Sequence, residues 1–292
     1  MKLKRNLMIS AMAAIGVLGL TACTDSGATT TAPEVSSDVQ FEAGSTMARL
    51  AAAGEITIGT KFDQPLFGQV GPDGVPVGFD VEMGKLIAAG LGISADNIKW
   101  VETLSANREP YIESGQVDVV IATYTINDTR KQVVSFAGPY YTAGQDLLVP
   151  ADNADGVTGP EYFKENPSAV VCTVSGSTSE ANIAKYTSNI IAAAGYGDCL
   201  EPLRTGAAAA LTTDNVILAG YADSTDGEFE VVGAPFTEEP YGIGLALDDT
   251  AFRTFINDTL EAAYADGAWA SAWESTAGAV LDTPEPPAVD RY

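Results

Sequence analysis

From residue 55 onward, the sequence alternates short apolar runs with segments that have a helical pattern. Residues 56–59, 98–101 and 117–121 are predicted strands, and the last of these runs is almost continuously apolar. Such a run is typical of a strand in a sheet that is covered on both faces. Two helices are predicted between these strands, over 79–91 and over 107–114. Asp80 is a candidate N-cap of the first helix. This order predicts a parallel sheet flanked by helices.

A second unit of the same kind follows. Strands are predicted at 169–171, 207–211 and 229–232, and a helix capped by Ser177 or Ser179 is predicted to run to Ala194. A further strand over 241–247 and two helices close the chain. Two α/β units joined by strands near 142–149 and 240–244 predict two lobes, and the cleft between two lobes is a common place for a small ligand.

The first residues of the chain predict its compartment. A basic start, Met1–Arg5, precedes an apolar run over 7–20, which has about the length of the apolar region of a signal peptide and is too short to span a bilayer. It ends at Leu20-Thr21-Ala22-Cys23, which resembles a bacterial lipobox. We therefore expect residues 1–22 to be a lipoprotein signal peptide and Cys23 to carry diacylglycerol on the extracytoplasmic face of the cell membrane. An ordinary secretory signal with an incidental cysteine is the alternative.

Net charge restricts the partners of the mature chain. Without the three basic residues of the predicted signal peptide, 12 Lys and Arg face 39 Asp and Glu, a formal charge of −27. This charge argues against nucleic acid or an anionic bilayer surface as a partner. The sequence has no histidine, the commonest general base and metal ligand. Neither a metal nor another cofactor is expected.

Two segments have the composition of flexible chain. Residues 23–50, rich in Thr, Ser, Ala and Gly, are predicted to form a lipid-anchored linker. Residues 281–292, with three prolines, are predicted to be a disordered tail.

Cys172 and Cys199 remain as a pair once Cys23 is assigned to the lipid. In an oxidising compartment an even pair predicts a disulfide. Closing a loop of this length stabilises a fold by roughly 3–4 kcal/mol in the chain-entropy model. Two buried free thiols are the alternative.

Four blocks with fixed order and spacing resemble a known family. They are Gly78-Phe79-Asp80-Val81-Glu82-Met83, residues 114–122, residues 125–133 and residues 136–141. Together with residues 175–179 and 211–214 they resemble the family 3 solute-binding proteins, the polar amino-acid receptors of ABC importers. Residues 60–65, 122–124 and 241–245 and the paired cysteines are similar to those of glutamate-binding lipoproteins.

The resemblance implies a fold and a set of partners. The expected fold class is α/β, two-lobed and periplasmic-binding-protein-like (type II), with two mostly parallel sheets flanked by helices and a two-strand hinge. Lobe 1 would comprise residues 51–145 and 241–280, and lobe 2 residues 146–240. We expect a monomer that delivers an amino acid to membrane permease subunits and that is not an enzyme. A catalytic, dehydratase-like member of the fold is the alternative in a different class.

The amino-acid head group sets the first requirement on the site. Both its carboxylate and its ammonium lose water in a closed cleft, so each needs a charged, hydrogen-bonded partner. The resemblance assigns the carboxylate to Arg130, with Thr125 and groups near Thr123, and the ammonium to Asp214. It also places Ser177 and Thr178 at a helix N-terminus, which favours an anion. The alternatives are a surface arginine for Arg130 and an N-cap for Asp214.

The side-chain pocket sets the second requirement. A γ-carboxylate needs further cations, and the resemblance assigns Arg108 and Lys61 to this part of the cleft, with Tyr241 as a wall. These cations predict glutamate as the ligand. Aspartate has the same charges on a shorter chain and stays open, whereas Arg108 argues against glutamine and asparagine. As alternatives, Arg108 would be an exposed helix-start residue, Lys61 a loop lysine, and Tyr241 core or hinge packing.

Overall fold

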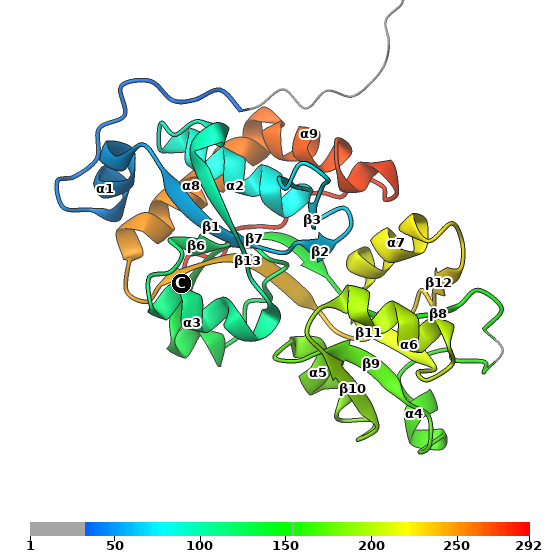
Figure 1. Ribbon diagram of the computed structural model, residues 1–292. Coiled ribbons are helices and arrows are strands. Elements are labelled where there is room, and N and C mark those ends of the chain that lie inside the picture. The colour runs from blue at the N-terminus through cyan, green and yellow to red at the C-terminus, as the bar shows by residue number, and fades with distance from the viewer. Residues whose placement is uncertain (1–32, 154) are drawn as a thin grey trace, which may run out of the picture.

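The computed structural model describes residues 33–153 and 155–292, which fold into two α/β lobes (Figure 1). The predicted signal peptide, Cys23 and residues 24–32 of the predicted linker lie outside the described residues. Within the described part of the chain, no helix has both the length and the apolar character needed to cross a membrane.

Lobe 1 is built on a five-stranded sheet in the order β5-β1-β6-β13-β7. Its strands are β1 (Ile56–Thr60), β5 (Ile98–Glu102), β6 (Val119–Val120), β7 (Val134–Ala143) and β13 (Glu239–Ala246). β13 runs antiparallel to β6 and β7, whereas β1 is parallel to β5 and β6. Successive strand residues such as Val119 and Val120 point to opposite faces, and both are fully buried. Apolar cores on both faces explain why this strand has no polar alternation.

Helices cover both faces of the lobe 1 sheet (Figure 1). One face is covered by α2 (Phe79–Gly90), α8 (Thr250–Asp266) and α9 (Ala268–Glu274), and the other by α3 (Arg108–Glu113). The 3-10 turns of this lobe are η1 (Ala95–Asn97), η2 (Ser105–Asn107), η3 (Arg130–Gln132) and η5 (Ala277–Ala279). A small separate sheet consists of β2 (Asp63–Gln64), β3 (Gly68–Val70) and β4 (Pro76–Val77).

Lobe 2 has a second five-stranded sheet in the order β10-β9-β11-β8-β12. Its strands are β8 (Gln145–Pro150), β9 (Val171–Val174), β10 (Ile190–Ala193), β11 (Ala210–Asp214) and β12 (Phe229–Val231). Its helices are α4 (Tyr162–Glu165), α5 (Thr178–Ile183), α6 (Leu200–Arg204) and α7 (Asn215–Ser224), with the 3-10 turn η4 (Tyr196–Cys199). The predicted long helix to Ala194 is wrong: α5 ends at Ile183, and residues 190–193 pair with β9 as an edge strand.

Two connections join the lobes. The chain passes from the first sheet to the second between β7 and β8 and returns between β12 and β13. In the first sheet only β13 opposes the direction of the other strands, and in the second only β8 does. The predicted fold class, two lobes with mostly parallel sheets flanked by helices, is confirmed.

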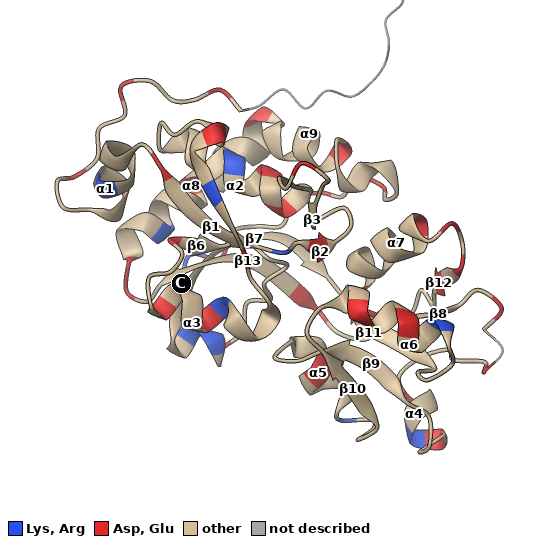
Figure 2. Ribbon diagram, viewed as in Figure 1, with Lys and Arg blue, Asp and Glu red and all other residues tan. Residues whose placement is uncertain are grey.

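Acidic residues outnumber basic residues in both lobes (Figure 2). Several exposed basic side chains form ion pairs, among them Arg49–Asp118, Lys99–Glu55, Arg204–Glu228 and Arg291–Glu261. Surface pairs of this kind contribute about 0–1 kcal/mol each. Unpaired cations inside such an acidic protein therefore need a separate explanation.

The end of the predicted linker is part of the folded body. α1 (Thr46–Ala53) begins after Ser45, whose hydroxyl accepts the N–H of Ala48 at 3.2 Å. Met47 and Leu50 are buried against lobe 1. The prediction of a linker up to residue 50 is thus wrong for residues 46–50, because a serine cap and two apolar side chains at helical spacing form a packed helix.

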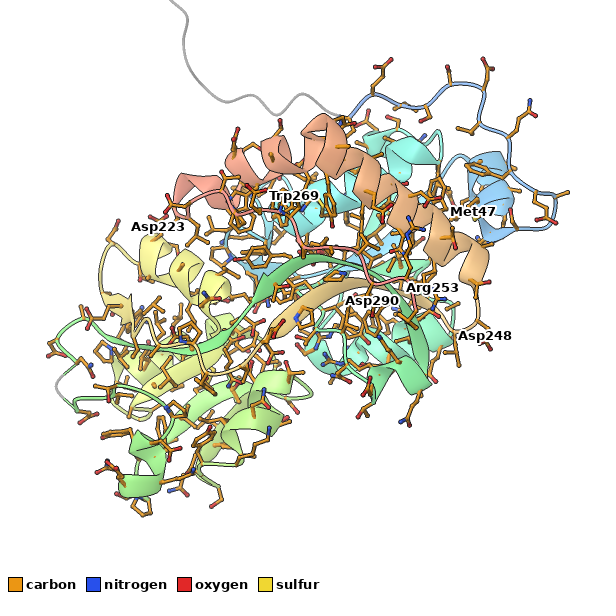
Figure 3. All side chains as sticks on the ribbon, turned by 180° about the vertical axis from the view of Figure 1, so that it is seen from behind. Met47, Asp223, Asp248, Arg253, Trp269 and Asp290 are labelled. Carbon is orange, nitrogen blue, oxygen red and sulfur yellow. A yellow bond between two sulfur atoms is a disulfide. The ribbon has the colours of Figure 1, made fainter. Side chains whose placement is uncertain are left out.

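The tail, residues 281–292, has no helix or strand, yet it packs on lobe 1. The N–H of Asp290 donates to the carbonyl of Gly138 at 2.8 Å, and the Tyr292 hydroxyl accepts the N–H of Phe136 at 2.8 Å. Figure 3 shows Asp290 near Arg253, whose guanidinium donates to the main-chain oxygen of Tyr292 at 2.6 Å. The prediction of a disordered tail is wrong: proline excludes a helix but permits an extended segment that covers the edge strand β7.

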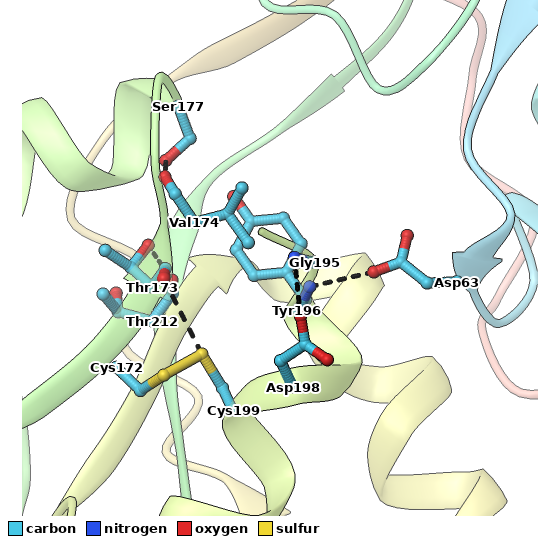
Figure 4. The surroundings of a disulfide bond; sticks show 10 residues. All are labelled: Asp63, Cys172, Thr173, Val174, Ser177, Gly195, Tyr196, Asp198, Cys199 and Thr212. Carbon is cyan, nitrogen blue, oxygen red and sulfur yellow. Dashed lines mark hydrogen bonds between the residues drawn. A yellow bond between two sulfur atoms is a disulfide. The ribbon is translucent and has the colours of Figure 1, made fainter. Parts of the chain in front are cut away.

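A disulfide joins Cys172 in β9 to Cys199 at the end of η4, with 5.6 Å between the Cα atoms (Figure 4). Both residues are fully buried. The predicted pairing is confirmed, and the alternative of two free thiols is wrong. The bond fixes η4 to the central part of the lobe 2 sheet.

Candidate functional site

The predicted site residues lie where the parallel strands of the two lobes end. Lys61 follows β1, Thr123 comes shortly after β6, and Asp214 is the last residue of β11. Ser177 and Thr178 come after β9. Ligands of α/β sheets bind at the carboxyl ends of strands. Of the nine predicted residues, Thr178 is half-buried and the other eight are buried.

Lobe 1 contributes three buried cations, which are 3%, 3% and 7% exposed for Lys61, Arg108 and Arg130. Arg130 pairs with Glu109 at 3.0 Å. Among residues 33–153 and 155–292, no carboxylate lies at ion-pair distance from Lys61 or Arg108. A buried charge without a partner costs several kcal/mol, so this wall of the site is suited to an anion.

The Lys61 ammonium donates to the hydroxyl of Ser105 at 2.9 Å. Burial and, next in size, the positive charge of Arg108 lower the pKa of Lys61 to about 7. At pH 7 the charged and neutral forms of this side chain are therefore similar in population. A carboxylate beside it would restore the charged form.

Arg108 is held by main-chain oxygens at the first turn of α3. Its Nε donates to Ser105 O at 3.2 Å, and its Nη1 donates to Ala122 O at 3.2 Å and to Thr123 O at 3.3 Å. These bonds orient the guanidinium but do not neutralise it. Its carbon lies 4.4 Å from the centre of the Tyr124 ring, a cation–π distance. The alternative of an exposed arginine at a helix start is wrong.

Arg130 spans the two lobes. Its Nη1 donates to Thr125 O at 2.7 Å within lobe 1, and its Nη2 donates to Gly176 O at 3.4 Å in lobe 2. With the bond to Glu109, three of its five N–H donors have protein partners, which leaves two for a carboxylate. Burial lowers the pKa of Arg130 to about 10, with Arg108 as the second cause. Arg130 is thus not a surface arginine.

Asp214 faces these cations from lobe 2 with one free oxygen. Its Oδ2 accepts the hydroxyl of Tyr241 at 2.6 Å, whereas Oδ1 is buried with no hydrogen-bond partner in the described chain. Burial and, next in size, the charge of Glu239 raise the pKa of Asp214 to about 7. A cation at Oδ1 would stabilise the carboxylate. Asp214 occupies the N-cap position of α7, but its side chain makes no capping bond to that helix.

Tyr241 stands behind Asp214. The ring is fully buried and packs edge-on against Phe67, with 6.1 Å between ring centres. Because its hydroxyl is bonded to Asp214, the geometry makes Tyr241 a residue that orients the carboxylate.

Ser177 and Thr178 begin α5. The Ser177 hydroxyl caps the helix by accepting the N–H of Glu180 at 3.0 Å, and it donates to Val174 O at 2.6 Å. The hydroxyl of Thr178 lies 3.4 Å from that of Thr125 in lobe 1. The structure therefore brings these predicted residues of the two lobes together.

Thr123 has a supporting role that the sequence did not indicate. It adopts a positive φ of 44°, and its N–H donates to Asp80 Oδ2 at 2.8 Å. Its hydroxyl donates to Gln64 Oε1 at 3.0 Å. The prediction of Asp80 as the N-cap of α2 is wrong: Gly78 is the N-cap, and Asp80 is the second residue of the helix. Burial raises the pKa of Asp80 to about 7, although bonds from Tyr140 and Thr123 lower it.

Sequence reasoning missed the residues that surround the charges. The supporting groups whose role the motifs did not indicate are Gln64, Asp80, Ser105, Glu109 and Glu239, although Gln64 and Asp80 lie within the quoted blocks. Two of these residues could have been noticed in the sequence. Asp80 is a carboxylate within an apolar helical segment, and Glu109 is a carboxylate directly after the predicted site residue Arg108. In the described part of the chain, no cluster of three or more His, Cys, Asp or Glu could hold a metal ion.

Comparison with known proteins gives a consistent result. The sequence model of the bacterial extracellular solute-binding proteins, family 3, matches residues 56–275. The chain is 37% identical over 268 residues to the glutamate-binding protein GluB of Corynebacterium efficiens, covering 88% of this chain and 85% of that protein. It is 31% identical to the glutamine-binding protein of Geobacillus stearothermophilus, over 87% of this chain and 96% of that protein.

Solved structures share the fold. The solute receptor for L-cysteine of Neisseria gonorrhoeae superposes with a TM-score of 0.75 at 28% identity, over 82% of this chain and 96% of that one. An ancestral amino acid-binding protein, described as a precursor of cyclohexadienyl dehydratase, gives a TM-score of 0.72 at 28% identity, over 80% and 99%.

Proposed function

Because this chain belongs to family 3 of the bacterial extracellular solute-binding proteins, we propose that it binds glutamate between its lobes and delivers it to the permease of an ABC importer. The named relatives are binding proteins, and the chain is a solute-binding protein rather than an enzyme. Transport would draw its energy from ATP at another subunit.

The charges at the two walls support an amino-acid head group. The free donors of Arg130 suit an α-carboxylate, and the unpaired Oδ1 of Asp214 suits an α-ammonium. A zwitterion that meets both residues would link lobe 1 to lobe 2. Its binding would then shift the population from open to closed lobes.

The observation that carries the glutamate proposal is the pair of buried cations, Lys61 and Arg108, without a carboxylate partner in the described chain. A γ-carboxylate would supply the missing negative charge. Glutamine, which the Geobacillus relative binds by name, would leave both charges unbalanced. Aspartate carries the same charges and is the second candidate, one methylene shorter.

The test is calorimetric titration of the mature protein with glutamate, aspartate, glutamine and asparagine. We expect glutamate to bind most tightly. Arg108→Ala should weaken glutamate binding far more than glutamine binding, because only glutamate places a charge beside it. An equal loss for both ligands would mean that Arg108 acts through the structure alone and would refute the assignment.

We also propose that the protein acts as a monomer on the extracytoplasmic face of the membrane, held by a lipid on Cys23. The lipobox-like sequence before Cys23 supports the anchor, and the family as described is extracellular. Two acyl chains suffice for stable attachment.

A further inference from the structure

Asp63 joins the lobes at a place separate from the predicted ligand contacts. It lies in β2, on lobe 1, and its Oδ2 accepts the main-chain N–H of Tyr196 in lobe 2 at 2.9 Å (Figure 4). Its own carbonyl accepts the hydroxyl of Tyr221, also in lobe 2, at 2.7 Å. One residue of lobe 1 thus makes two hydrogen bonds across the cleft.

The fit around these bonds requires glycine on the lobe 2 side. A Cβ atom on Gly195 would lie 2.6 Å from Asp63 Oδ2. A Cβ atom on Gly220, in α7, would lie 2.8 Å from the carbonyl of Pro65. A side chain at position 195 would displace the Asp63 carboxylate from the Tyr196 N–H, and one at position 220 would meet the main chain of lobe 1. The two glycines therefore permit the approach that the bonds need.

The receiving side is held by further bonds within lobe 2. Asp198 accepts the N–H of Gly195 at 3.1 Å, which shapes the turn before Tyr196. The disulfide from Cys199 to Cys172 ties η4 to β9. The loop that follows β9 carries Ser177, part of the lobe 2 wall of the site. The position of the Tyr196 N–H is therefore coupled to that wall.

We propose that Asp63 is a latch that stabilises the closed lobes without contacting the ligand, and that the disulfide positions η4 to receive it. This inference rests on the proposed function, since it assumes that closure accompanies amino-acid binding. The bond to Tyr196 can form only when the lobes meet. Its loss should therefore accelerate ligand release and leave the association rate unchanged.

The test measures L-glutamate association and dissociation rates by stopped-flow tryptophan fluorescence on the mature protein. Asp63→Ala should raise the dissociation rate about tenfold, the effect of losing one charge-assisted hydrogen bond of about 1.4 kcal/mol. Asp73→Ala is the matched control, because Asp73 lies in the turn of the same small sheet and accepts only the nearby N–H of Val75. It should leave both rates unchanged.

Asp63→Asn separates the latch from a simple charge effect. The Asp63 carboxylate also raises the pKa of Lys61, so removing its charge could act through the site. The amide retains an acceptor for Tyr196 but carries no charge. The latch predicts that Asp63→Asn raises the dissociation rate by less than half as much as Asp63→Ala does, on a logarithmic scale. An equal rise in the two variants would overturn the latch.

The disulfide is tested by a double-mutant cycle. Removing it through Cys172→Ser with Cys199→Ser should also accelerate release, and adding Asp63→Ala should then have a smaller further effect than in the wild type. Full additivity would overturn the role of the disulfide. Unchanged rates in Asp63→Ala would overturn the latch, whereas a wild-type protein that binds none of the twenty amino acids would refute the proposed function instead.

Discussion

Lys61 should oppose closure of the lobes when no ligand is bound. In the closed arrangement burial lowers its pKa from 10.5 to about 7, and we expect open lobes to return the ammonium to water and to its ordinary pKa. At pH 7 the burial of Lys61 then makes closing of the ligand-free lobes less favourable by about 4 kcal/mol, since each unit of pKa corresponds to 1.36 kcal/mol. Lys61→Met keeps an unbranched side chain, one atom shorter, and removes this cost.

The variant should therefore close more readily without ligand. A change of about 4 kcal/mol in the closing equilibrium is a factor of roughly a thousand. Small-angle scattering of the ligand-free protein would report closure as a smaller radius of gyration. Lys99→Met is the matched control, because the Lys99 side chain is 61% exposed and pairs only with Glu55.

The pH dependence has a defined sign. Closing lowers the pKa of Lys61 and so releases a proton, which means that ligand-free closure becomes easier as pH rises from 7 toward 10. Closing raises the pKa of Asp214 from 3.8 to about 7, so this carboxyl takes up a proton and favours closure as pH falls from 7 toward 4. Lys61→Met should abolish the alkaline response and leave the acidic one.

Ligand choice provides a second measurement on the same variant. Without the ammonium, glutamate should lose affinity relative to glutamine, since the γ-carboxylate no longer gains a partner. The reasoning is refuted if Lys61→Met matches Lys99→Met both in scattering without ligand and in the glutamate-to-glutamine affinity ratio.

Three further outcomes are expected. Arg130→Ala should weaken amino-acid binding by roughly 3 kcal/mol or more, measured by calorimetry, because it leaves a buried carboxylate unpaired; unchanged affinity would reject the site. Tyr292→Ala should lower the free energy of unfolding by about 1–2 kcal/mol in urea titrations, since its ring lies 3.7 Å from Lys131 Nζ and its hydroxyl accepts the Phe136 N–H; no change would mean that the tail is not bound in solution. Cys23→Ser should release the protein from the membrane fraction of cells, and continued membrane retention would contradict the lipid anchor.

The proposed ligand contacts could be predicted because they lie within contiguous motifs. Arg130, Asp214 and Thr125 each belong to a block whose order and spacing resemble the family, and the structure buries them where the two lobes meet. Arg108 could be predicted only through this resemblance. Its buried guanidinium is held by the carbonyls of Ala122 and Thr123, which follow a different strand, so its local sequence does not indicate burial.

The errors share a physical cause, which is that tertiary contacts override local preference. Residues 190–193 follow a helix and are rich in alanine, yet they pair with β9 as a strand. The proline-rich tail binds through Asp290 and Tyr292 to lobe 1, partners far away in the sequence. Asp63 lies in the stretch 60–65 that resembles glutamate-binding lipoproteins, but the stretch does not indicate its role, which exists only once the two lobes are placed against each other.

Two opposing contributions set the position of the closing equilibrium. Buried charges at Lys61 and Asp214 raise the free energy of the closed form when the site holds no ligand, whereas the bonds of Asp63 lower it. A ligand can shift this equilibrium only by the difference in its affinity for the two forms. An amino acid with an anionic side chain removes the unfavourable charge contributions and leaves the favourable latch. It follows that ligand selectivity and ligand-dependent closure have a common origin. Variants that neutralise the site should lose both together, because their lobes close without ligand, whereas latch variants should change the release rate of every ligand by the same factor.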